Sequence, residues 1–357
     1  MELKEKTIEK ALIEYRSPSN IALVKYWGKM GLQMPMNPSV SFTLNACATT
    51  TCVEFNAIQN DRMEVQFEFF FEGAPKPDFH PKLNTFFDRI LRDFPALKNY
   101  HLRLDSSNSF PHSSGIASSA SAMSALALCL GEFEKKLLGE QYASDFDQRI
   151  SNWSRLGSGS ACRSVIPELG LWGYSPDIEG SSDKYAIAID GIAPVFKDFR
   201  DIVLLVDKGE KQISSTAGHA LMNGHAYTAA RIEQAHLNLI ELLDTMRNGN
   251  LEKFVKIVEN EALSLHAMML SSDPGYFLFK PETLKIIEAI RSFRQQNGIH
   301  LCFTLDAGAN VHLLYPSKDE KEVLGFVEGE LLVFCQNGEY ICDSVGKGPE
   351  RLKAQYD

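Results

Sequence analysis

The chain has 357 residues, of which 44% are hydrophobic and 23% charged, a composition typical of a globular protein with two domains or one large one. Its formal net charge of −10, without any basic run, argues against nucleic acid or an anionic membrane as a partner. No window approaches about 18 uninterrupted apolar residues, and the charged N-terminus lacks the apolar core of a secretory signal, so we expect a cytoplasmic protein.

The cysteines and histidines show no metal-binding pattern. The seven cysteines are scattered through apolar surroundings, and none forms a CxxC pair. We therefore expect buried, reduced thiols rather than a zinc site or a disulfide framework. The nine histidines show no HExxH or other metal-ligand spacing.

Strand and helix signals are mixed in the first half of the chain. β-Branched and aromatic residues in partial alternation predict strands at 38–55, 63–71, 100–107, 171–174 and 184–189. Helical patterns, one of them rich in alanine, predict helices at 82–93, 115–137 and 142–156, the last ending near Gly157.

The second half is predicted to be richer in helices. A buried strand at 201–209 precedes STAGHALM (215–222), which we expect to open a long helix. Further helices are predicted at 226–246, 251–271, 281–296 and 318–329, and strands within 300–308, 310–316 and 331–336. The absence of a regular βαβ rhythm favours an α+β fold over a doubly wound sheet. We place a domain boundary between 190 and 200.

The segment SPSNIALVKYWGKMG (17–31) carries two lysines directly after an apolar run. Lys25 and Lys29 stand four residues apart, and Gly28 between them allows a turn or a close approach to a ligand. Together the lysines would make an electropositive spot. The alternative is a strand end with solvated lysines, which the pattern by itself favours.

The segment SFPHSSGIASSASAMSA (109–125) places a proline, a glycine and several serines just before the alanine-rich helix. The free N–H groups and the dipole at a helix start bind anions, and serine hydroxyls add donors or a magnesium ligand. Neither the Walker pattern nor the dinucleotide GxGxxG is present. An ordinary serine-capped helix explains the pattern equally well.

The segment GSGSACRS (157–164) resembles a flexible linker but carries an arginine and a cysteine. Ser158 and Ser160 offer hydroxyls, and Arg163 is a planar donor suited to carboxylate or phosphate. A true linker would be longer and would join segments that fold separately. We therefore interpret the segment as an anion pocket.

Asp306 lies between a hydrophobic strand and a small-residue turn in CFTLDAGANVHL (302–313). Partial burial at a sheet edge would suit this carboxylate to accept a proton. The alternative, an aspartate that caps the turn with its side chain, is favoured by the pattern alone.

In this order, the four segments resemble the mevalonate diphosphate decarboxylase family of the GHMP kinase superfamily. The motifs that carry the resemblance are NIALVKYWGK, FPHSSGIASSAS, GSGSACRS, ISSTAGH (213–219), FTLDAGAN and VGKGP (345–349). They extend over nearly the whole chain. The resemblance implies an N-terminal domain like the second domain of ribosomal protein S5, at 1–194, and a ferredoxin-like C-terminal domain at 195–357.

The reaction implied is the ATP-dependent decarboxylation of mevalonate 5-diphosphate to isopentenyl diphosphate, with Mg²⁺, in isoprenoid biosynthesis. The 3-hydroxyl is phosphorylated, then phosphate leaves and the carboxylate is lost as CO2. The resemblance also implies a homodimer. The alternatives are a related enzyme acting on mevalonate or its monophosphate, as a 3-kinase or a decarboxylase, and a catalytically silent homologue.

By motif position, the resemblance makes Asp306 and Lys25 the catalytic residues and Arg163 the holder of the substrate carboxylate. The full set placed around the substrate is Tyr26, Trp27, Gly28, Lys29, Ser158, Gly159, Ser160, Ala161, Cys162, Arg163 and Thr216. The set placed around the nucleotide is Ser113, Ser114, Gly115, Ser118 and Ser119, with Ser118 or Ser119 also on the metal.

The sequence departs from the family pattern at several positions. His112, Ser113, Ser114 and Ile116 replace Thr, Ala, Ala and Leu of the usual phosphate loop. The usual NSS is Asn-Pro-Ser at 37–39, and DAGPN is DAGAN at 306–310. The family's further substrate arginine, expected in the helix before the phosphate loop, has no clean counterpart here, and Arg89 is the nearest candidate.

Overall fold

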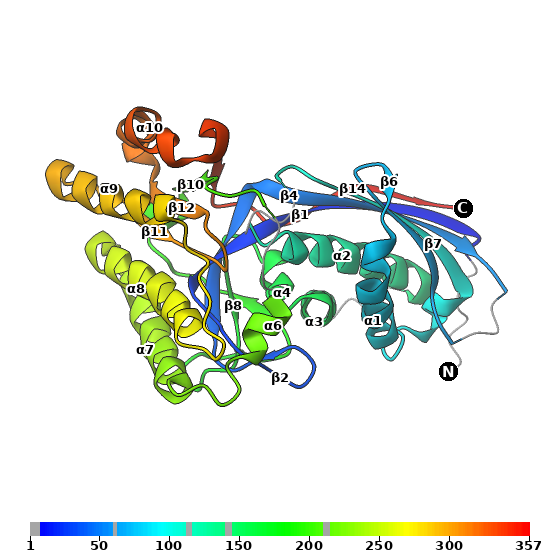
Figure 1. The fold of residues 1–357 in the computed structure, drawn as a ribbon. Helices are drawn as coiled ribbons and strands as arrows, with labels where there is room; N and C mark the ends of the chain where they lie inside the picture. The colour runs from blue at the N-terminus through cyan, green and yellow to red at the C-terminus, as the bar shows by residue number, and fades with distance from the viewer. Residues whose placement is uncertain (1–7, 60–62, 112–115, 140–144, 210–214) are drawn as a thin grey trace.

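The computed structural model describes residues 8–59, 63–111, 116–139, 145–209 and 215–357. Within these ranges the strands form an eight-stranded, a four-stranded and a two-stranded sheet. Helices and sheets are mixed (Figure 1), which confirms the predicted α+β class. None of the helices in these ranges is long and apolar enough to cross a membrane.

The large sheet is built on two long antiparallel strands, β1 (Lys10–Val24) and β4 (Ser39–Ala57). Their pairing shifts register near Pro18 and again near Val24, and the strands bend along this stretch. The strand order is β14 (Glu350–Tyr356), β1, β4, β7 (Tyr100–Asn108), β5 (Gln66–Phe71) and β6 (Ala74–Pro75), while β8 (Leu169–Trp172) and β9 (Ala186–Ala188) extend from β4.

Three helices cover one face of this sheet (Figure 1): α1 (His80–Ile90), α2 (Ser118–Leu138) and α3 (Phe146–Gly157). The small residues of α2 allow it to lie close against β1 and β4. Its Ser124 hydroxyl meets that of Ser17 at 2.6 Å, and its Ser121 hydroxyl meets that of Thr49 at 2.6 Å. The close approach places the start of α2 beside the bend of β1.

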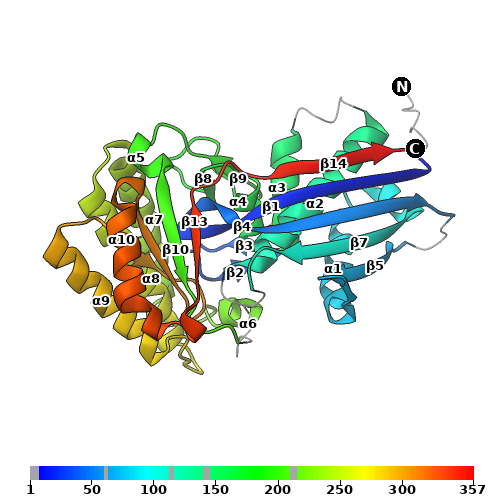
Figure 2. The ribbon, with the colours of Figure 1, turned by 90° about the horizontal axis from the view of Figure 1, so that it is seen from above.

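The four-stranded sheet has the order β11 (Cys302–Thr304), β12 (Val311–Pro316), β10 (Phe199–Leu204) and β13 (Tyr340–Ser344). The helices around it are α7 (Thr228–Arg247), α8 (Leu251–Leu270), α9 (Pro281–Asn297) and α10 (Glu320–Phe326) (Figure 2). The remaining short elements are β2 (Lys29–Met30), β3 (Met34–Pro35), α4 (Ala161–Ser164), α5 (Pro194–Lys197) and α6 (Ser215–Ala220).

A side-chain carboxylate and a close backbone approach join the two larger sheets. The Asp343 carboxylate of β13 accepts the N–H groups of Asn45, Ala46 and Cys47 in β4, at 2.7–2.8 Å. Just beyond it, Gly346 lies so close to β4 that a Cβ atom would be 2.1 Å from the Leu44 carbonyl oxygen. A side chain at Gly346 would therefore force this contact with β4 to shift.

Two sequence predictions for this part of the chain are wrong. Residues 331–336 form helical turns rather than a last strand, because buried Val327, Leu331 and Cys335 recur at the four-residue spacing of a helix. The actual final strands, β13 and β14, were not predicted; β14 is mostly exposed and polar. It pairs with β1, so the end of the chain lies in the large sheet.

Two further expectations need correction. The helix opened by STAGHALM is short, because α6 ends at Ala220 and a turn with Gly224 at φ +79° separates it from α7. The seven thiols are free, but Cys342 is exposed and Cys52 only partly buried. The domain boundary near 194 stays a prediction.

Candidate functional site

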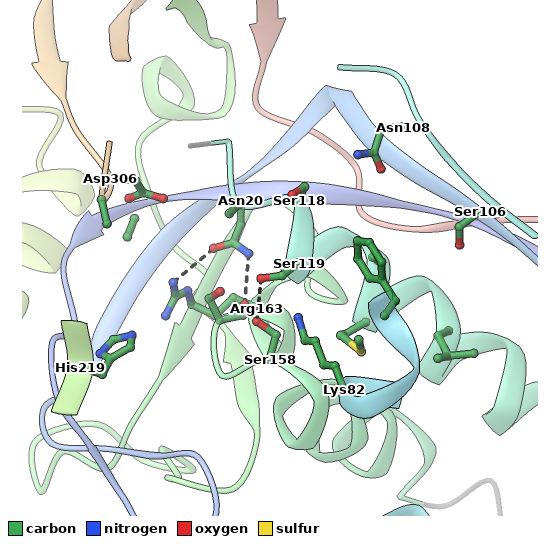
Figure 3. A pocket seen from close by; sticks show the side chains of 18 of the residues that line it. Asn20, Lys82, Ser106, Asn108, Ser118, Ser119, Ser158, Arg163, His219 and Asp306 are labelled. Atoms are coloured by element: carbon green, nitrogen blue, oxygen red, sulfur yellow. Dashed lines mark hydrogen bonds between the residues drawn. The ribbon is translucent and has the colours of Figure 1, made fainter. Parts of the chain in front are cut away.

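A cavity of about 340 Å³ lies where the end of β1, the start of α2, α4 and the β11–β12 connection meet (Figure 3). Predicted site residues that line it are Lys25, Tyr26, Trp27, Lys29, Ser118, Ser119, Ser158, Ser160, Arg163 and Asp306. The segment GSGSACRS is therefore part of a cavity wall. Residues that are far apart in the sequence, such as Lys25 and Asp306, therefore line the same cavity.

Lys25 and Asp306, which both line this cavity, form an ion pair. Lys25 Nζ lies 2.8 Å from Asp306 Oδ1, and the lysine side chain is only 2% exposed against 25% for the aspartate. Burial lowers the pKa of the Lys25 ammonium, and the neighbouring Asp306 carboxylate opposes this effect. The pair gives the cavity a carboxylate within reach of a ligand and a cation behind it.

Arg163 is a buried cation, and the hydrogen bonds of its side chain within the described part of the chain go to neutral oxygens. Its Nε donates to Ser41 Oγ at 2.9 Å, its Nη2 to Asn20 Oδ1 at 3.2 Å, and its Nη1 to Ser39 Oγ. Burial lowers the pKa of its guanidinium. Because a buried charge is costly unless it is compensated, this geometry favours an anionic ligand. The motif pointed to Arg163 but not to Asn20, Ser39 or Ser41.

Aromatic rings form another wall of the cavity. His219, which the sequence did not single out, stacks on Tyr26 with ring centroids 4.9 Å apart and lies 4.3 Å from the Trp27 ring. Its Nδ1 accepts the Gly28 N–H at 3.0 Å, so Nε2 carries the proton of the neutral ring. Burial lowers the pKa of His219 well below its usual value.

Gly28 itself does not line the cavity but shapes this wall. Its φ is +102°, and a Cβ atom there would lie 2.3 Å from Met36 Sδ. The predicted glycine is therefore required by its conformation and by the close packing, and it presents its N–H to His219.

Lys29 and Lys82 form a second positive region. Lys82 points from α1 toward the Ser119–Ser158 pair (Figure 3), and no sequence pattern marks it because a lone lysine on a helix is usually solvated. Burial, with repulsion from Lys82 and Arg89, lowers the pKa of Lys29 to about 8. Arg89 does not line the cavity; its guanidinium donates to the Leu156 carbonyl at 2.5 Å.

The start of α2 borders the cavity without a side-chain cap. The residue before it, Ala117, is left-handed with φ 48°, and no side chain caps the first turn among the described residues. Ser119 Oγ lies 3.1 Å from Ser158 Oγ, and Ser118 also lines the cavity. The uncapped N–H groups and the hydroxyls suit a phosphate group.

Beyond the start of α2 the cavity becomes apolar. Its lining residues there are Phe69, Phe71, Phe79, Leu83 and Leu104, with Ser106 and Asn108 as polar members. The described residues contain no group of three histidine, cysteine, aspartate or glutamate side chains that could hold a metal ion. Among these residues, a divalent cation at the site would rely mainly on ligand oxygens and serine hydroxyls.

The other predicted site residues lie outside the cavity wall or outside the described residues. Ala161 and Cys162 are fully buried in α4, and burial raises the pKa of the Cys162 thiol to about 12. A Cβ atom at Gly159 would lie 2.9 Å from the Trp172 ring. Ser113, Ser114 and Gly115 lie outside the described residues, as does the side chain of Thr216.

Comparison with known families gives two consecutive matches. Residues 17–186 match the diphosphomevalonate decarboxylase-like N-terminal domain, and residues 201–353 match the mevalonate 5-diphosphate decarboxylase C-terminal domain. Among curated relatives, a diphosphomevalonate decarboxylase of Aspergillus fumigatus is 29% identical over 338 residues, covering 88% of this chain and 79% of the relative.

Solved structures agree with these matches. A mevalonate diphosphate decarboxylase from Staphylococcus aureus superposes with a TM-score of 0.82 at 27% identity, covering 96% of this chain and 98% of that one. A structure named MDDEF, in complex with MVAPP, AMPPCP and magnesium, has a TM-score of 0.80 at 26% identity, covering 96% and 99%.

Proposed function

The chain belongs to the mevalonate diphosphate decarboxylase family, and we propose that it converts mevalonate 5-diphosphate and ATP to isopentenyl diphosphate, ADP, phosphate and CO2. The expected two-domain GHMP kinase fold is confirmed by the same matches. The observation that carries the proposal is the Lys25–Asp306 pair, which lies in one cavity with the buried, cationic Arg163.

Asp306 serves as the base in this proposal. Its carboxylate accepts the proton of the substrate 3-hydroxyl as the hydroxyl oxygen attacks the γ-phosphorus of ATP. Lys25, 2.8 Å away, balances the negative charge that gathers around the transferring phosphoryl group. The protein thereby converts a poor leaving group, hydroxide, into phosphate.

Arg163 orients the carboxylate that departs. When phosphate leaves C3, positive charge grows on that carbon, and the electrons of the C–C bond to the carboxylate move inward to form the double bond. A carboxylate held by Arg163 is fixed in direction while its neutral neighbours leave the guanidinium fully charged. Lys29 and Lys82 supply positive charge for the diphosphate.

ATP enters this scheme as a substrate and brings Mg²⁺ with it. The phosphate groups of ATP would be held by Ser118, Ser119 and the uncapped start of α2. The apolar end of the cavity would accept its adenine ring. Bound Mg²⁺ would neutralise charge on the phosphate oxygens. We also propose a homodimer, which the family resemblance implies.

Replacing Asp306 tests the assignment of the base. Asp306→Asn keeps the size of the side chain but removes the proton acceptor, so we expect turnover to fall by about 10²–10⁴-fold while ATP still binds. ADP release measures turnover, and a fluorescent nucleotide analogue measures binding. Asp244→Asn, on the exposed side of α7, is the matched control. Near-normal turnover of Asp306→Asn would refute the role of Asp306 as base.

A further inference from the structure

Helix α8 contacts both residues of the proposed reacting pair through their backbones. Glu261 Oε2 accepts the Lys25 N–H at 2.8 Å, and His266 Nε2 lies 3.1 Å from the Asp306 carbonyl oxygen. The two helical residues are five positions apart, about 7.5 Å along the axis. Lys25 and Asp306, in contrast, are 281 positions apart in sequence. Helix α8 therefore holds the backbone of one residue at a defined distance from the backbone of the other.

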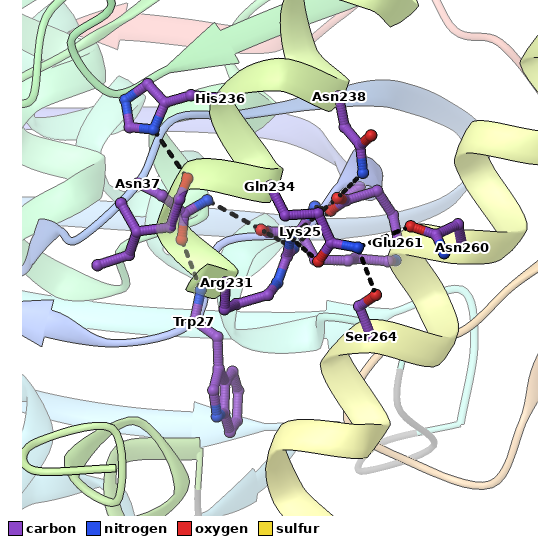
Figure 4. A network of polar contacts seen from close by, with 12 residues as sticks. Lys25, Trp27, Asn37, Arg231, Gln234, His236, Asn238, Asn260, Glu261 and Ser264 are labelled. Atoms are coloured by element: carbon purple, nitrogen blue, oxygen red, sulfur yellow. Dashed lines mark hydrogen bonds and ion pairs between the residues drawn. The ribbon is translucent and has the colours of Figure 1, made fainter. Parts of the chain in front are cut away.

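The Glu261 carboxylate is fully buried and is itself held firmly (Figure 4). Arg231 of α7 donates to its two oxygens at 2.9 and 2.5 Å, and Asn238 donates to Oε1 at 2.6 Å. Arg231 also donates to the Lys25 carbonyl oxygen at 3.0 Å. Both polar backbone groups of Lys25 therefore contact one buried ion pair, and Asn37 Nδ2 also donates to the Lys25 carbonyl oxygen at 3.0 Å.

His266 holds Asp306 from the same helix. Burial lowers its pKa to about 4, so the ring is neutral near pH 7. Because a carbonyl oxygen only accepts, the proton lies on Nε2, which donates to Asp306. The ring stacks on Phe279 with centroids 4.1 Å apart and planes 11° from parallel. This packing leaves the histidine little freedom to move away.

We propose that Glu261, Arg231 and His266 are positioning residues that set the separation between the Lys25 ammonium and the Asp306 carboxylate. The proposal rests on the proposed function of that pair. Lysine has a long, flexible stem, so its ammonium is placed reliably only if its backbone is fixed. A shift of about 1 Å at a reacting group costs about 100-fold in rate, which a looser backbone would produce.

The first test replaces Arg231 by lysine, which keeps the charge but cannot bridge Glu261 and the Lys25 carbonyl. Its control is Arg294→Lys on α9, which makes the same chemical change in a pair with Glu259 of α8, at 2.5 Å, away from the cavity. We expect kcat of Arg231→Lys to fall about 10–100-fold with both KM values within about threefold of wild type.

The pH profile separates positioning from a merely structural effect. Moving the ammonium away from Asp306 raises the pKa of that carboxylate, so the acid limb of the kcat profile shifts to higher pH in Arg231→Lys and stays in place in Arg294→Lys. Wild-type kcat and an unshifted limb in a folded Arg231→Lys protein would overturn the proposal. Denaturant midpoints of both variants report their stability.

A second pair of variants keeps the proposal testable where Arg231→Lys fails to fold. His266→Phe retains the stack on Phe279 but removes the N–H donor, and His266→Gln restores a donor. We expect the phenylalanine variant to lose kcat and the glutamine variant to recover part of it. Equal kcat in the two variants would contradict a positioning role for His266.

Failure of the proposed function can be distinguished from failure of the positioning proposal. Wild-type protein that forms ADP without CO2 refutes decarboxylation, and the variants are then compared by ADP release. Competitive acetylation of Lys25, followed by peptide mass spectrometry against pH, needs no turnover. We expect the Lys25 pKa to fall in Arg231→Lys as the carboxylate moves away, and an unchanged value would overturn the positioning proposal.

Discussion

The cavity of this acidic protein carries a local excess of positive charge. Lys25, Lys29, Lys82 and Arg163 line it, whereas Asp306 is its only acidic lining residue among those described. The chain as a whole has a net charge of −10. Burial makes the charges of Lys25 and Arg163 costly in the free protein, so an anionic substrate that pairs with them regains part of that cost. The arrangement favours an anionic ligand over a neutral one.

The charge of Lys29 is expected to make kcat/KM depend on pH. Its pKa of about 8 means that its charge is lost as pH rises through that value. We expect kcat/KM for mevalonate diphosphate, which reports the free enzyme, to decline above about pH 8. Lys29→Arg stays charged and should move the decline to higher pH. Lys256→Arg, on the exposed face of α8, is the control. Identical profiles for wild type and Lys29→Arg would contradict the role of Lys29.

At the residue scale, the sequence identifies site residues best where they stand inside a short, distinctive motif. Arg163 stands out in its own segment, whereas Lys25 and Asp306 are singled out only by the resemblance of the ordered motifs to a known family. His219, by contrast, contacts Gly28 across 191 positions, and Asn20 contacts Arg163 across 143. Lys82 and Glu261 have neighbours that suggest an ordinary helix. Such contacts depend on how the elements pack, which the local pattern does not contain.

At the scale of elements, helix α8 contributes to the packing of the fold and also carries residues that contact the proposed site. It begins with Asn250, whose side chain accepts the Lys253 N–H at 3.0 Å, and its buried face packs against α7, β11 and the end of β1. The helix was predicted at 251–271 and is found at Leu251–Leu270 because its apolar period is regular. Residues 331–336 show the opposite case, since a short apolar run fits a strand and a helical turn equally well.

The N-cap of α8 provides a stability prediction. Asn250→Ala leaves a first-turn N–H without its acceptor, so we expect the free energy of unfolding to fall by about 1 kcal/mol. Urea denaturation followed by circular dichroism measures this change. Asn250→Asp retains an acceptor and should lie close to wild type. Because Asn250 is far along the helix from Glu261, kcat should remain unchanged, and a large loss of kcat would contradict the separation of the two roles.

At the scale of the whole molecule, the cavity lies on the junction between the two larger sheets. Lys25 follows β1 of the large sheet, whereas Asp306 follows β11 of the four-stranded sheet. The junction itself is closed by Asp343 and Gly346, which bind the second sheet to β4. The sequence indicated two parts and mixed topology, but the return of β14 to β1 joins residues too distant for pattern reasoning to pair.

The ratio of products formed by the purified wild-type protein tests the proposed reaction most directly. The protein is incubated with Mg-ATP and either mevalonate 5-diphosphate or the 5-monophosphate, and ADP and CO2 are measured in the same samples. We expect equal amounts of ADP and CO2 with the diphosphate and much slower turnover with the monophosphate. ADP without CO2, or a preference for the monophosphate, would contradict the proposed reaction.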